Sequence, residues 1–116
     1  MKHSRELFSL FRLILEAEFR LKNRVNFRQR DRILFDGAEC FGDYWGEPLD
    51  SGGFQHKIRV ATSEVHTPEA LFATLAHEYV HAWQMETGRE LDHDLASGFA
   101  GWQEHFQRHY GIDILG

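Results

Sequence analysis

The residues best suited to chemistry lie in the stretch 74–83, which contains the pattern His-Glu-x-x-His inside a sequence that predicts a helix. Two histidines four positions apart lie about 40° apart around a helix axis, so His77 and His81 can reach one metal ion. Glu78 follows His77 directly, where its carboxylate can act as general base toward a water molecule that the metal activates. The pattern predicts a zinc hydrolase with this helix as its rigid platform.

A catalytic zinc site takes three protein ligands and keeps one position open, so a third ligand is expected downstream. His93 follows His81 after enough chain for the rest of the helix, a reversal at Gly88 and a return. We therefore predict that His77, His81 and His93 bind one zinc ion, although manganese or cobalt could use the same nitrogens. The alternatives for the third ligand lie further along the chain: Glu104, His105 and His109.

The elements that must position these residues can be read from the hydrophobic pattern. Residues 5 to about 24 have apolar residues at near-helical spacing without Gly or Pro, and predict an amphipathic helix. The polar residues 26–32 predict a loop or a fraying helix end, and residues 33–35 and 38–46 predict two short strands around the turn Asp36-Gly37. Residues 54–60 alternate in polarity as a half-buried strand does, with His56 on the inward face as a structural histidine.

The motif helix has recognisable boundaries. Thr67 is a suitable N-cap, Pro68 suits the first helical position, and Gly88 suits the end, so the helix is expected to run to about Thr87. A last helix is predicted over residues 95–110, with Phe99, Trp102 and Phe106 on one side. The fold class expected is therefore α+β, with a small antiparallel or mixed sheet of about three strands.

Composition indicates an ordinary globular domain. The chain has 116 residues, of which 42% are hydrophobic and 27% charged, so it can bury a core and is not a disordered segment. Charged residues from Arg12 to Arg20 interrupt the apolar run near the start, which excludes a signal peptide or a membrane span there. Cys40 is the single cysteine, which fits a reducing compartment. We expect a cytoplasmic protein with no membrane partner.

Positive charge is concentrated early in the chain. Residues 1–32 carry nine Lys or Arg against four Asp or Glu, a balance of +5, whereas residues 33–116 carry four against fourteen, a balance of −10. Such a cluster can hold the phosphates of DNA, or it can be a solvated surface that pairs with acidic groups of the later part. The candidate DNA contacts are Arg20, Lys22, Arg24, Arg28, Arg30 and Arg32.

A longer pattern extends from the motif through residues 77–84, then Gly88, Asp92, His93, Phe99 and Trp102. It resembles the SprT-like zinc metalloprotease domain, a family that includes Spartan proteases and small phage or plasmid members, most strongly over residues 54–93. The resemblance implies a zincin-like α+β fold, zinc bound by His77, His81 and His93, and Glu78 as general base. It also implies proteolysis of proteins bound or crosslinked to DNA.

Some features depart from the family pattern. Members commonly follow the third histidine with a small residue and place an aromatic residue four positions on, whereas Asp94 and Ser97 stand at these positions. Asp92 and Asp94 are expected either to orient an imidazole N–H or to cap the last helix. With one cysteine there is no zinc ribbon like that of many members, so residues 1–116 are expected to form a single SprT-like domain.

These expectations together describe a zinc-dependent metallopeptidase that acts on protein or peptide substrates. Strand 54–60, if it lies at a sheet edge, would align an extended peptide by strand addition. The developing oxyanion needs a partner, for which the candidates are Tyr79, His105, His109 and Tyr110. The alternative is a non-catalytic binding or regulatory module that zinc stabilises through the same histidines. Glu78 argues against it, because a purely structural site needs no base.

Overall fold

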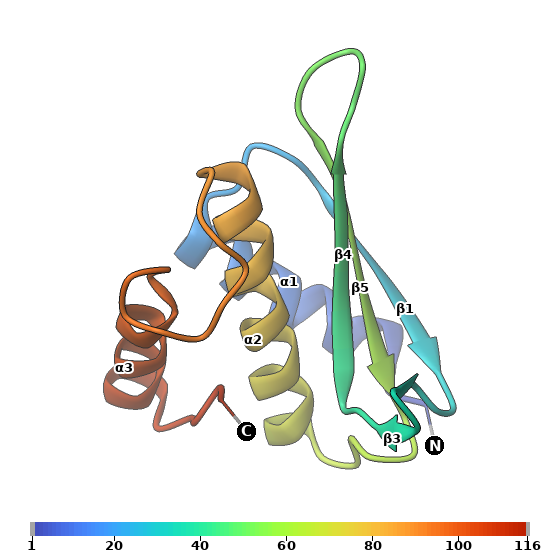
Figure 1. The fold of residues 1–116 in the computed structure, drawn as a ribbon. Coiled ribbons are helices and arrows are strands. Elements are labelled where there is room, and N and C mark those ends of the chain that lie inside the picture. Colours follow the sequence, from blue (N-terminus) through green and yellow to red (C-terminus); the bar gives the residue numbers. More distant parts are fainter. Residues whose placement is uncertain (1, 116) are drawn as a thin grey trace.

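The computed structural model describes residues 2–115 and has the expected α+β class, with three helices beside a small mixed sheet (Figure 1). The elements are α1 (Arg5–Phe19), β1 (Val25–Arg30), β2 (Leu34–Phe35), β3 (Ala38–Glu39), β4 (Gly42–Pro48), β5 (Phe54–Ala61), α2 (Pro68–Glu86) and α3 (Phe99–Tyr110). None of the helices within residues 2–115 has the length and apolarity that a membrane crossing requires.

The first helix is shorter than its sequence pattern predicts. Ser4 caps α1 by accepting a hydrogen bond from the backbone of Leu7, and the helix ends at Phe19 because Arg20 adopts a left-handed conformation. The expected loop over residues 26–32 is also wrong, since Val25–Arg30 forms β1. Its polar residues gave no strand signal, and pairing with β5 decides the conformation, an example of tertiary context overriding local preference.

The three-stranded sheet has the order β1-β5-β4, in which β5 runs parallel to β1 and antiparallel to β4. The alternation expected in β5 is confirmed, because His56, Ile58 and Val60 are buried. The condition for strand addition to residues 54–60 is not met, because β5 is the central strand, and β4 is the edge strand next to α2. The single strand predicted over 38–46 is divided between the β2–β3 hairpin and β4.

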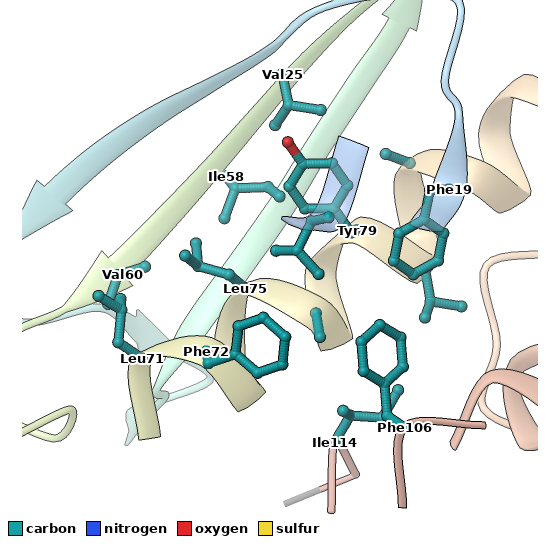
Figure 2. Close-up of a cluster of buried hydrophobic side chains, with 14 of the residues drawn as sticks. Phe19, Val25, Ile58, Val60, Leu71, Phe72, Leu75, Tyr79, Phe106 and Ile114 are labelled. Carbon is teal, nitrogen blue, oxygen red and sulfur yellow. The ribbon is translucent and has the colours of Figure 1, made fainter. Parts of the chain in front are cut away.

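Helix α2 has the predicted boundaries. The side chain of Thr67 accepts a hydrogen bond from the backbone of Ala70, Pro68 opens the helix, and Gly88 follows its end with a φ of 70°. Figure 1 shows α2 in the middle of the molecule, with the sheet on one side, α3 on the other and α1 behind it. In the core around it, side chains from α2 meet side chains from the sheet, α1 and the C-terminal segment (Figure 2).

The last helix begins later than its pattern predicts. Residues 95–98 form a turn, Gly98 has a φ of 88°, and α3 starts at Phe99. The expected inward side is confirmed, since Phe99 and Phe106 are buried and Trp102 packs against Phe19. The delayed start leaves residues 87–98 as an irregular segment between α2 and α3.

Close packing of β4 on α2 predicts a stability effect at Gly42. A β-carbon there would lie 2.7 Å from the carbonyl oxygen of Arg59 and 2.8 Å from Cγ2 of Thr74, so Gly42→Ala must push the strand and helix apart. We expect a loss of about 1–3 kcal/mol in the free energy of unfolding, measured by urea denaturation. Gly101→Ala is the control: a β-carbon at this exposed helical position meets nothing within 4 Å, and it should stabilise by about 0.5–1 kcal/mol. Equal effects of the two substitutions would contradict this packing.

Candidate metal centre

The three predicted histidines meet on one side of α2. One nitrogen from each of His77, His81 and His93 lies within 4.8 Å of the other two. The Nε2 atoms of His77 and His93 are 3.2 Å apart. Two nitrogens bound to one zinc ion at about 2.0–2.1 Å with tetrahedral angles would lie about 3.3 Å apart. The donor set and the spacing of the His77 and His93 nitrogens therefore fit a zinc ion.

His77 is held by the C-terminal segment of the chain. Its Nδ1 lies 2.6 Å from the carbonyl oxygen of Ile114, which can only accept, so Nδ1 carries the proton and Nε2 keeps its lone pair. Burial lowers the pKa of His77 to about 4, which keeps the imidazole neutral at pH 7. The side chain is therefore in the form that binds a metal ion.

His81 is positioned by Gln84, one turn further along α2. Its Nδ1 lies 2.8 Å from Oε1 of Gln84, and burial lowers the pKa of His81 as well. Gln84 is fully buried, and its amide group donates to the carbonyl oxygens of Asp92 and Ser97, at 2.8 and 3.3 Å. One glutamine therefore joins the ligand helix to the segment that carries His93.

The segment around His93 is shaped by its two aspartates and by Phe99. Asp92 accepts from the backbone of His93 at 2.7 Å, and Asp94 accepts from the backbone of Ser97 at 2.8 Å, so both stabilise the turns before α3. The ring of Phe99 lies 4.8 to 5.7 Å from the three imidazole rings. This apolar ring packs against the imidazoles and restricts the rotation of the histidine side chains.

Glu78 lies next to His77 and lines a cleft beside the histidine cluster. The residue is only 6% exposed, and burial raises the pKa of Glu78 to about 8, with a further contribution from the carboxylate of Asp43. A bound dication would act in the opposite direction and favour the ionised carboxylate. The raised pKa means that the Glu78 carboxylate takes up a proton more readily than an exposed glutamate does, as a general base must.

The other ligand and oxyanion candidates lie elsewhere. Glu104 forms an exposed ion pair with Arg108 on α3. His105 and Tyr110 both hydrogen-bond to Glu18 of α1, and the His109 ring lies 4.5 Å from that of His105. Tyr79 is fully buried, and its ring lies 5.7 Å from that of Phe19 and 6.1 Å from that of Phe27. Figure 2 shows Tyr79 and Phe19 within the core. The described contacts of these side chains are therefore with α1, with the core or with other residues of α3.

Several contributing residues carry a weak sequence signal or none. Gln84 could have been suspected from its place three residues after His81, which brings the two side chains to one side of the helix. The carbonyl of Ile114 has no sequence signal, because any residue offers the same oxygen. Tyr44 reaches the site through strand pairing alone, with its ring 6.4 Å from that of His81.

The basic residues separate into two groups. Arg24, Arg28 and Arg30 line a groove of about 740 Å³ between α1 and β1, together with Lys2, Arg5 and Arg12. The other candidates lie outside this groove: Arg20 ends α1, the backbone of Lys22 binds Glu86, and Arg32 pairs with Glu39. The structure thus brings together half of the predicted DNA contacts and adds three cations from the N-terminal region.

Comparisons with protein-family models and with curated proteins found no match. The assignment of a role to this centre therefore depends on its geometry and on the sequence pattern.

Removal of His93 tests the third ligand. We expect His93→Ala to weaken zinc binding by more than the about 10–100-fold typical for loss of a residue that only orients a ligand. Zinc affinity measured by competition with a chelating dye checks this. The side chain is exposed, so the fold should persist. Glu104→Gln is the control: unchanged zinc affinity is expected, and a loss as large as that of His93→Ala would restore Glu104 as a ligand.

Proposed function

We propose that this protein is a zinc-dependent metallopeptidase of the SprT-like type. The observation that carries the proposal is the convergence of His77, His81 and His93 beside a buried Glu78 that faces an open cleft. A zincin-like architecture agrees with the helix that carries the motif and with the edge strand beside it. The sequence resemblance to SprT-like proteases supports the same conclusion.

The residues of the site divide the chemistry between them. The three imidazoles would hold zinc, which when bound polarises the carbonyl of the scissile bond and activates water for attack. Glu78 accepts a proton from the attacking water and donates it to the leaving amine. Because Glu78 is buried, little water screens its carboxylate, and the interactions of that carboxylate with neighbouring charges are stronger than at the surface. Gln84 and the Ile114 carbonyl keep two imidazoles in the required orientation.

Strand β4 is suited to align the substrate. It is a sheet edge with unpaired backbone groups, and it passes beside both Glu78 and His81. An extended peptide can add to such an edge through main-chain hydrogen bonds, with side chains supplying selectivity. This requirement favours flexible or unfolded segments as substrates.

The alternative is a non-catalytic module in which zinc only stabilises the fold. Such a module would not account for Glu78, because burying a carboxyl group beside a cleft costs free energy that a structural site has no reason to bear. Substitution of Glu78 therefore distinguishes the peptidase from the structural module.

Glu78→Gln should leave zinc bound and lower peptide cleavage by at least about 100-fold, since the amide cannot accept the proton. Cleavage of an unfolded protein such as casein, with zinc content measured in parallel, checks this. The control is Glu69→Gln, an exposed position in the first turn of α2, which should keep full activity. Persistent cleavage by Glu78→Gln would remove the general-base assignment, and a wild-type protein that binds zinc without any cleavage would favour the structural module.

We further propose that the groove between α1 and β1 binds DNA, so that the peptidase acts on DNA-associated proteins. Six cations line the groove, and phosphate binding by such a cluster needs no base-specific contact. Phe27 also lines the groove, with the guanidinium of Arg12 4.3 Å from its ring centre. The cluster is thus organised on a defined surface of the fold.

The triple variant Arg24→Ala, Arg28→Ala and Arg30→Ala should weaken DNA binding and reduce the slope of log affinity against log salt by about 2–3, close to one unit per lost phosphate contact. Fluorescence anisotropy with a labelled duplex at several salt concentrations measures both quantities. A control that removes the same charge outside the groove replaces Arg20, Arg32 and Arg108 with Ala. Equal losses in the two variants would indicate a net-charge effect and contradict the groove.

A further inference from the structure

The face of the sheet that points away from α2 carries a second group of charged and aromatic side chains. Successive side chains of a strand point to opposite faces, so the burial of His56 places Lys57 and Arg59 of β5 on this outer face. Trp45 of β4 pairs with Lys57, and Asp43 pairs with Arg59, so both share the outer face with their partners. The strand register therefore brings an aromatic ring and several charges together.

These side chains line a pocket of about 380 Å³, within the range for small-ligand sites, which is about 300–1,000 Å³. Arg30, at the end of β1, adds another cation to its wall. The pocket shares no lining residue with the cleft beside Glu78, and it meets the groove between α1 and β1 at Arg30. It is thus a site separate from the metal centre.

Positive charge in this pocket exceeds what its own carboxylate neutralises. Arg59 donates from Nε to Asp43 at 2.8 Å and forms an ion pair with it. Among the ion pairs described for residues 2–115, none includes Lys57 or Arg30. Arg28 lies next to Arg59 on the neighbouring strand, which adds repulsion between like charges. An anion bound over this face would relieve that repulsion.

Trp45 gives the pocket an aromatic surface that the core does not use. The residue is 47% exposed, and the ammonium group of Lys57 lies 5.8 Å from its ring centre. An exposed indole can stack on a nucleobase, and cations beside it can bind phosphate. The pocket is therefore complementary to a nucleotide, with the base on Trp45 and the phosphates toward Lys57 and Arg30.

The charges along β4 favour a single nucleotide over a nucleic-acid strand. Asp43 and Glu47 lie on the same face as Trp45, one on each side of it along the strand. A strand that crossed Trp45 along β4 would bring its phosphates close to one of these carboxylates. Single-strand binding sites also stack successive bases on several aromatic side chains, whereas Trp45 is the aromatic residue among the outward positions of this sheet.

We propose that the outer face of the sheet binds a free purine nucleotide with two or three phosphates. The base stacks on Trp45, where the two rings of a purine give the larger contact, and Lys57 and Arg30 bind the phosphates. The proposal does not depend on the peptidase function, because the pocket and the metal centre have no residue in common.

Isothermal titration calorimetry of the zinc-loaded protein tests this with ATP, tripolyphosphate and a short single-stranded oligodeoxyadenylate. Tripolyphosphate matches the phosphates of ATP, including any contact they make with zinc. ATP should bind at least about tenfold tighter, the factor that stacking of one base provides. Trp45→Ala should reduce ATP affinity to that of tripolyphosphate and leave tripolyphosphate binding unchanged, whereas Trp45→Phe should keep part of the preference. Lys57→Ala should weaken binding of both probes.

The controls are Phe35→Ala and Lys22→Ala, which remove an aromatic ring and a cation at exposed positions outside the pocket. Both should keep the wild-type affinities. Equal wild-type affinity for ATP and tripolyphosphate, or equal effects of Trp45→Ala and Phe35→Ala, would overturn the site. An oligonucleotide that binds more tightly than ATP and loses this affinity in Trp45→Ala would overturn the assignment to a free nucleotide.

Discussion

The central burial of α2 is the constraint on which the rest of this structure depends. Its side chains pack against the sheet, α1 and the C-terminal part of the chain, so the helix cannot rotate or slide without exposing apolar surface. His77 lines the cleft, and His81 lies one turn further along α2, where its ring is 5.1 Å from that of His77. The packed core therefore holds the backbone of both histidines in place, so their positions are as rigid as the core itself.

The remaining parts of the centre come from segments that have no regular structure of their own. Gln84 connects α2 to the backbone of residues 92 and 97, and the carbonyl of Ile114 connects the C-terminal segment to His77. These bonds join distant stretches of the chain at the point where they meet the ligands. The same C-terminal segment also forms one wall of the cleft, so orientation of a ligand and shape of the cleft depend on one element.

A second polar cluster fixes the far end of α2. The carboxylate of Glu86 accepts from the backbone of Lys22 and Asn23 and from Nε2 of His56, whose Nδ1 accepts from the hydroxyl of Tyr44. This arrangement confirms His56 as a structural histidine with both ring nitrogens satisfied. It also gives a physical reason why α1 stops at Phe19: the chain must turn there to place its backbone N–H groups on Glu86 and begin β1.

The sequence by itself determined the local features. The ligand helix follows from Thr67, Pro68 and Gly88, because capping and left-handed backbone preferences act within a few residues. The burial of one side of β5 follows from its alternation, and the approach of His93 to the other two histidines follows from chain length and one reversal. Only the tertiary structure decided that residues 25–30 form a strand, that β4 rather than β5 is the edge, and that Gln84 and the Ile114 carbonyl orient the ligands. The pairing of β1 with β5, which makes β5 central, joins residues more than thirty positions apart, and the Ile114 carbonyl is an oxygen that every residue carries, so no local pattern could specify them. Gln84 had only a weak local signal, its place three residues after His81.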